Sequence, residues 1–315
     1  MKKNLFYLSM LALVLTFAAC SSDGEDVGDL TSSATSGNAP ELRANLPHKA
    51  LNLSFSESAP LTSLQLTETG KAIIEVPNLL YNAHQRRASG KNGNTHYIIG
   101  TYTIQGTLYI ILDDQGNPYC ELVVTIVPNT NKANVTINMK NGAEIDATEF
   151  EADVVEKIAS DDVTTALCRE WTVATTRLRH KGSVTGIKQF ERPAENPASL
   201  NDILDYAKSV ATINEHFNED MVITSVEFTQ AGTFCIFFEN GEHYIGKWSW
   251  EDASKGYIHY DWDSDDMGNR FENGEAVFDV RQYKKTNYYT LTLGATITDS
   301  GKDYEVELSF YLSEK

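Results

Sequence analysis

The chain has 315 residues, of which 41% are hydrophobic, and it carries 44 acidic against 26 basic side chains, a formal net charge of −18. This length suits one large or two ordinary domains, and we expect two. The acidic balance argues against nucleic acid and against anionic lipid headgroups as partners, because both would be repelled at long range.

The first residues have the features of an export signal. Met1–Lys3 is positively charged, residues 5–19 form an apolar run, and the small residues Ala18 and Ala19 precede Cys20. The run is too short to span a membrane comfortably. This block resembles a bacterial lipobox, which implies a signal peptide over residues 1–19 and lipidation of Cys20. The alternative is an ordinary cleaved signal peptide in which Cys20 has no role.

The residues after Cys20 indicate where in the cell the protein is expected to be. Ser21–Asp26 resembles the acidic export signal of Bacteroidetes lipoproteins that reach the outer face of the cell. The resemblance implies an outer-membrane lipoprotein that is anchored through Cys20 and exposed at the cell surface. Residues 20–47 hold few large apolar side chains, so we expect a disordered tether there.

Residues 48–145 show short alternating runs separated by turn residues. Leu51–Phe55 alternates with period two, and the runs 107–112 and 119–127 flank a turn rich in Asp, Gly and Asn. The pattern predicts an N-terminal antiparallel β-domain, as a sandwich or an open barrel. Residues 146–162 are predicted to form a helical connector, because Thr148 or Asp146 can cap a helix whose apolar stripe includes Phe150 and Val154.

Residues 163–315 are predicted to form a β-barrel with one inserted helix. Ser199 and Asp202 stand at capping-box spacing before that helix, and Asn240–Gly241 favours a type I′ hairpin. About eight strands follow one another from Trp171 in hairpin order, the number at which an up-and-down barrel encloses side chains or one small ligand. The expected fold class is therefore mainly β, with two antiparallel β-domains.

Three motifs in this region resemble the lipocalin-like domain of Bacteroidetes lipoproteins. They are Leu167–Trp171 (LCREW), Phe228–Phe234 (FTQAGTF) and Gly246–Ser249 (GKWS). The resemblance implies a small β-barrel without assigned catalytic residues. The chain differs from secreted lipocalins because it lacks their Gly-x-Trp motif at the first strand, where Glu170 stands directly before Trp171.

The C-terminal strands concentrate aromatic residues that have two interpretations. They can line a pocket for a small apolar molecule or stack on sugar rings, or they can fill a closed barrel core. The set comprises Phe234, Phe238, Tyr244, Trp248, Trp250, Tyr260 and Trp262.

An acidic stretch gives a partial calcium-loop pattern. Asp261, Asp263 and Asp265 occupy positions 1, 3 and 5, and Glu272 occupies position 12. Position 6 is Asp266 where the loop needs glycine, so a solvated acidic hairpin end is the alternative. Calcium is the one cofactor that the sequence suggests.

The remaining chemistry is sparse. Cys120, Cys168 and Cys235 lack metal-ligand spacing, and Cys168 and Cys235 either pair or stay buried as thiols. No nucleophile, zinc-protease, phosphate-loop or dinucleotide motif occurs. The leading hypothesis is a non-catalytic envelope lipoprotein that binds a small apolar molecule or a glycan. The alternatives are an adhesion module that binds another protein, and a hydrolase of surface glycans that uses a carboxylate pair.

Overall fold

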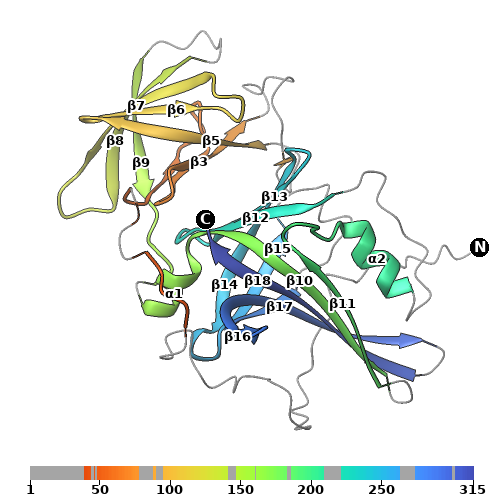
Figure 1. Cartoon of the computed structure of the whole chain (residues 1–315). Helices are drawn as coiled ribbons and strands as arrows, with labels where there is room; N and C mark the ends of the chain where they lie inside the picture. Colours follow the sequence, from red (N-terminus) through yellow and green to blue (C-terminus); the bar gives the residue numbers. More distant parts are fainter. Residues whose placement is uncertain are drawn as a thin grey trace, which may run out of the picture.

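A computed structural model shows two closed antiparallel β-barrels of eight strands each (Figure 1). It describes residues 39–43, 46, 48–77, 88–89, 95–140, 147–159, 161–182, 186–208, 221–262, 274–299 and 302–315. The fold class predicted from the sequence, mainly β with two antiparallel β-domains, is confirmed. Within these ranges, no helix combines the length and the hydrophobicity needed to cross a membrane.

The N-terminal barrel has the strand order β3-β2-β1-β9-β8-β7-β6-β5, and β3 pairs with β5 to close it. A short strand, β4 (Ala88–Ser89), also pairs with β5. The sequence left a sandwich and an open barrel as alternatives for this domain, and the β3–β5 pairing shows a closed barrel instead. Its eight strands are β1 (Leu51–Phe55), β2 (Ser63–Leu66), β3 (Lys71–Pro77), β5 (Thr95–Gln105), β6 (Leu108–Leu112), β7 (Pro118–Ile126), β8 (Lys132–Met139) and β9 (Thr148–Val154).

The core of the N-terminal barrel is formed by side chains that alternate between its inside and its outside along each strand. Leu64, Leu66 and Ile74 point into the core, where they are fully buried, and the intervening residues face outward. In the register of β3 and β5, Ile74 lies opposite Ile98, and both belong to the same core. Closure leaves this sheet with no unpaired edge among these eight strands.

The predicted helical connector over residues 146–162 is wrong. Thr148–Val154 forms β9, which pairs with β8 on one side and β1 on the other. Phe150, Ala152 and Val154 alternate with acidic residues, so the segment also fits a strand, and tertiary pairing decides between the two periods. The helix of the connector is α1 (Asp162–Leu167), where the Asp161 side chain accepts a 2.7 Å hydrogen bond from the Thr164 amide.

The C-terminal barrel has the order β10-β12-β13-β14-β15-β16-β17-β18, and β10 pairs with β18 to close it. An additional strand, β11 (Gly186–Pro193), pairs with the edge of β10 opposite to β18. The eight barrel strands are β10 (Glu170–Gly182), β12 (Ile223–Phe228), β13 (Thr233–Phe238), β14 (His243–Asp252), β15 (Tyr257–Trp262), β16 (Gly274–Tyr283), β17 (Thr286–Asp299) and β18 (Lys302–Glu314). A 3₁₀ turn, η2 (Ala253–Lys255), links β14 to β15.

Trp171 packs among other aromatic residues in the core of the C-terminal barrel. Its indole is fully buried, lies 5.2 Å from the Tyr289 ring and 6.0 Å from the Phe278 ring, and donates a 2.9 Å hydrogen bond to the Leu167 carbonyl. The bond joins α1 to the barrel, and burial of an aromatic side chain of this size is a large stabilising contribution.

The inserted helix is α2 (Leu200–Lys208), as predicted. The Ser199 hydroxyl accepts a hydrogen bond from the Asp202 amide at 3.0 Å, and the Asp202 carboxylate accepts one from the Ser199 amide at 3.2 Å. This reciprocal pair is the capping box that the spacing indicated. Ile203 packs into the core of the second barrel.

The expected tether is partly ordered. Ala39 and Leu42 pack against the core of the C-terminal barrel, and the Arg43 amide donates a 2.9 Å hydrogen bond to Glu314. Arg169, which is 5% exposed, donates to both the Arg43 carbonyl and the Glu314 carboxylate. The prediction of disorder up to residue 47 is therefore wrong for residues 39–43, because apolar burial and charge pairing fix them; residues 20–38 lie outside the described part.

One hairpin turn differs from the prediction. At Asn240–Gly241 only Gly241 has a positive φ, of 82°, and β13 and β14 are joined by a longer loop, so the predicted type I′ turn is wrong. The turn with two positive φ angles is Lys284–Lys285, with φ of 47° and 70°. Left-handed conformations cost a residue other than glycine about 1 to 2 kcal/mol each, so this turn is strained.

Gly246 is required by close packing. A Cβ atom there would lie 2.2 Å from the Phe234 ring and 2.6 Å from the Asp261 carbonyl oxygen. We expect Gly246→Ala to lower the free energy of unfolding by about 1 to 3 kcal/mol, the usual cost of overpacking, in urea denaturation. Ser249→Ala is the control because Ser249 is an exposed residue of the same strand, β14, so no close contact is added. Equal losses in the two variants would contradict the packing argument.

Candidate functional site

Six of the seven predicted aromatic residues lie in or against the core of the C-terminal barrel. Five of the six are no more than 9% exposed, and Trp250 is partly buried against them. Their rings pack edge to face, as in Phe238–Tyr244 at 5.3 Å and Trp248–Trp250 at 5.4 Å. The five are Phe234, Phe238, Tyr244, Trp248 and Tyr260.

This placement favours the core interpretation over a ligand cup. The Trp248 indole is 3% exposed and donates a 3.1 Å hydrogen bond to the Thr229 carbonyl, so its polar atom is used within the fold. Burial raises the pKa of Tyr260, as expected for a phenol in a dry core. Trp262 ends β15 opposite Gly246, and its side chain lies outside the described part of the chain.

The acidic stretch is described only at its start. Asp261 lies in β15, and its carboxylate is 3.6 Å from His259. Asp263, Asp265 and Glu272 lie outside the described residues, as does Cys20. Among the described residues, no group of three or more His, Cys, Asp or Glu side chains could hold a metal ion.

A different aromatic cluster lies on the opposite face of the same barrel. Tyr283, Tyr288 and Tyr311, from β16, β17 and β18, have ring centroids 5.2, 6.0 and 6.5 Å apart. Phe310 and Leu312 belong to the core, so alternation turns Tyr311 away from it. Tyr311 is 2% exposed, and Tyr283 and Tyr288 are half-buried. We call these three residues the tyrosine cluster.

Charged side chains border the tyrosine cluster. Arg177 of β10 donates to the Tyr311 hydroxyl at 3.4 Å and lies 3.4 Å from Glu191, which accepts a hydrogen bond from Tyr283 at 3.2 Å. Arg281 binds Asp279 at 2.9 Å and Glu307 at 3.0 Å. The cluster thus combines ring faces with planar hydrogen-bonding groups from five strands.

Sequence reasoning missed this cluster. Its members are dispersed over residues 177–311, and only the closed barrel brings β10 beside β18. One signal was present: Tyr283 and Tyr288 stand on either side of the Lys284–Asn287 turn. Alternation from Phe278 and Val280 in the core would have placed Tyr283 on the outside.

The two barrels meet at a second candidate site. Ile73, Tyr97 and Ile99 of the first barrel pack against a patch of the second, made of Cys235, Phe237 and Ile245. The Gln65 amide donates to the Thr233 hydroxyl at 2.9 Å and accepts from the Thr229 hydroxyl at 3.1 Å. We call this surface the junction.

Lys71 is the charged centre of the junction. Its ammonium group lies 2.6 Å from Glu170, 3.2 Å from Glu227 and 4.1 Å from the centroid of the Phe237 ring. Burial by itself would raise the pKa of Glu170, but the ammonium groups of Lys71 and Lys315 outweigh it and hold that pKa below its usual value. The carboxylate of Glu170 therefore stays charged and binds the first barrel to the second.

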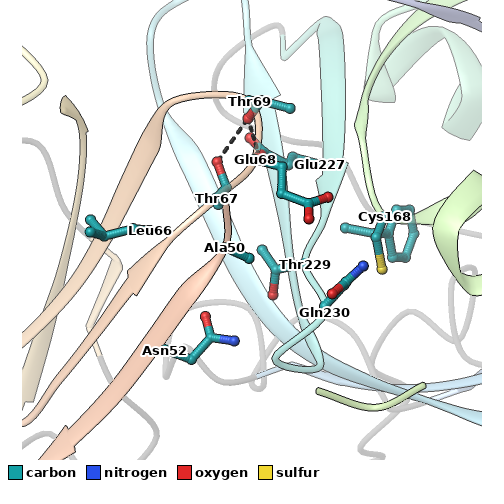
Figure 2. Close-up of a pocket in the computed structure, with 11 residues that line it drawn as sticks. Ala50, Asn52, Leu66, Thr67, Glu68, Thr69, Cys168, Glu227, Thr229 and Gln230 are labelled. Atoms are coloured by element: carbon teal, nitrogen blue, oxygen red, sulfur yellow. Dashed lines mark hydrogen bonds between the residues drawn. The ribbon is translucent and has the colours of Figure 1, made fainter. Parts of the chain in front are cut away.

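The junction also encloses a cavity (Figure 2). Asn52, Thr67 and Glu68 line it from the first barrel, and Cys168, Glu227 and Gln230 from the second. Its volume is about 10 Å³, measured as space for the centre of a water-sized sphere. That is the room one water molecule needs, so the cavity is too small for a sugar or a lipid.

The three described cysteines are buried free thiols, which resolves the alternative of a Cys168–Cys235 disulfide. Burial raises the pKa of Cys120 to about 12 and raises those of Cys168 and Cys235 as well. Thiolates, which are the reactive form, are therefore disfavoured at all three positions.

Comparisons with protein families, with curated proteins and with solved structures found no match for this chain.

We expect Glu170→Gln to lower the free energy of unfolding by about 1.5 to 3 kcal/mol at pH 7, the range for hydrogen bonds to charged groups. The pKa of Glu170 is lowered by folding, so its stabilisation is present above the unfolded pKa and disappears as the pH falls through the folded pKa. The difference from the parent protein should shrink between pH 4.5 and more acidic conditions, as measured by urea denaturation. Exposed Glu149→Gln is the control, and an equal deficit at every pH would disprove the charge argument.

The thiols give a second prediction. In the chain after Cys20, we expect a thiol-reactive disulfide reagent at pH 8 to label less than one cysteine while the protein is folded, because burial disfavours the thiolates. All three should react in guanidinium chloride. Rapid labelling of the folded chain would show that at least one thiol is accessible.

Proposed function

We propose that this protein is a non-catalytic lipoprotein of the cell envelope that binds glycans through the tyrosine cluster of its C-terminal barrel. The observation that carries the proposal is the grouping of three tyrosine rings with Arg177 and Glu191 on the face turned away from the core. It keeps the glycan hypothesis of the sequence and moves the site from the core aromatics to the tyrosine cluster.

The chemistry of the cluster suits a sugar. The apolar face of a pyranose ring stacks on aromatic rings, and its hydroxyls exchange hydrogen bonds with guanidinium and carboxylate groups. Tyr283 and Tyr288 are half-buried, so each has a fixed orientation and an accessible part. A small apolar ligand would instead need an enclosed pocket, and the aromatics expected to line one are packed in the core.

The envelope location rests on the sequence. Cys20 and the acidic residues after it favour a lipid anchor at the cell surface. The packing of Ala39, Leu42 and Arg43 on the C-terminal barrel supports attachment of the tether to the barrel that carries the tyrosine cluster. A lipoprotein arranged in this way would hold a polysaccharide near the cell.

One observation favours adhesion to a protein as the second candidate function. In the described part of the chain, every exposed large hydrophobic side chain comes from the first barrel or from the segment after it. Contiguous apolar patches of several hundred Å² mark interaction surfaces, so the adhesion hypothesis requires these side chains to be adjacent. They are Ile104, Val123, Ile126, Val155 and Ile158.

Binding to immobilised polysaccharides tests the glycan proposal. We expect Tyr283→Ala and Tyr288→Ala each to weaken binding about tenfold, which corresponds to roughly 1.4 kcal/mol of lost stacking, in biolayer interferometry with the chain after Cys20. Tyr257→Ala is the matched control, because Tyr257 is a partly exposed tyrosine of the same barrel that also has a lysine over its ring. Unchanged affinity in both cluster variants would refute the site.

A further inference from the structure

The turn beside the tyrosine cluster is built from two lysines. Lys284 and Lys285 are its central residues, both exposed, and Tyr283 pairs with Thr286 at its base. Positive φ at both central positions is the type I′ geometry, for which Asn-Gly is the preferred sequence. The turn therefore places two exposed lysines directly after Tyr283, on a backbone that lysine does not favour.

One of the two lysines, Lys284, contacts a ring of the tyrosine cluster. The Lys284 ammonium lies 5.0 Å from the centroid of the Tyr283 ring, within cation–π distance. The pKa of Lys284 is raised by a hydrogen bond to Tyr283 and by the nearby carboxylates of Glu191 and Glu195. Lys285 makes no ion pair with any residue that the structure describes.

Arginines pair with three carboxylates near the cluster. Glu191 lies beside Arg177, and Arg281 binds both Asp279 and Glu307. Glu191 and the exposed Glu195 also act on Lys284, whereas Lys285 forms no ion pair among the described residues, so it is the unpaired cation at the edge of the cluster.

We infer that the ligand of the tyrosine cluster is an acidic polysaccharide, whose carboxylate or sulfate groups bind Lys284 and Lys285 while its rings contact Tyr283 and Tyr288. The inference rests on the proposed glycan-binding function and adds the class of glycan. Lysine ammonium groups bind such anions as point charges.

The net charge of the protein is compatible with this ligand. At physiological salt the Debye length is about 8 Å, so repulsion from distant carboxylates is screened and the nearby lysines dominate. Double-stranded DNA carries one charge per about 1.7 Å, whereas a uronic acid chain carries at most one carboxylate per ring. The sparser polyanion suffers less repulsion from the rest of the surface.

The test compares two matched pairs of polysaccharides: polygalacturonate with its fully methyl-esterified form, and dextran sulfate with dextran. Each pair keeps the sugar backbone and removes the charge. We expect the chain after Cys20 to bind the charged member of at least one pair about tenfold more tightly, with a preference that falls as salt is raised.

The key variant is Lys284→Asn with Lys285→Gly. It removes both charges but installs the sequence that the turn prefers, so its melting temperature should be no lower than that of the parent. We expect it to lose the preference for the charged polysaccharide and to keep the weaker binding to the neutral one. Lys255→Asn is the control, since Lys255 also lies over a tyrosine of this barrel, at 5.6 Å.

The contradicting outcomes are distinct. Equal binding of charged and neutral members would overturn the acidic class and leave the glycan function standing. No binding to any of the four, or binding unaffected by Tyr283→Ala, would remove the proposed function itself. Tighter binding to duplex DNA or to anionic vesicles than to either acidic polysaccharide would overturn the choice of a glycan.

Discussion

Closure of each sheet into a barrel is the constraint on which the rest of this structure depends. β10 hydrogen-bonds along its length to β18, and β3 does the same to β5, so each sheet becomes a cylinder with an inside and an outside. Side chains alternate along a strand, and closure therefore assigns every residue to one of two environments. A shift of register by one residue would exchange the two sets completely.

This constraint explains which parts of the fold could be predicted from the sequence. Local periodicity and turn residues were sufficient for the strands of both domains and for the capped helix α2, because those signals lie within short windows. They were insufficient at Thr148–Val154, where Phe150 and Val154 fit a helical stripe and a strand equally well. The pairing of β9 with β1, nearly 100 residues away in the chain, decided the matter, and no local window contains that information.

The candidate site follows the same logic. Trp248 and Tyr260 were visible as aromatic residues on alternating strands, but a linear sequence does not say whether such a row fills a barrel or lines a cup. In the structure both side chains are buried in the core of the barrel. Tyr311 and Arg177, by contrast, form a hydrogen bond only because β10 and β18 are adjacent. Sites made from one face of a closed sheet draw on many strands, and for that reason they escape motif searches.

The junction shows how the same outward faces are used differently on two sides of one barrel. On β12 to β14, outward residues such as Glu227 and Cys235 are covered by the first barrel, and Lys71 supplies the charge that makes burial of Glu227 tolerable. On β16 to β18 the outward residues form the tyrosine cluster, and next to them the chain accepts left-handed lysines where Asn-Gly would cost less. Local strain of this kind persists when the surrounding structure enforces it, and it is concentrated at sites that act on other molecules. The two faces thus differ: one pairs its charges internally and unites the barrels, and the other places two exposed lysines beside partly buried tyrosine rings.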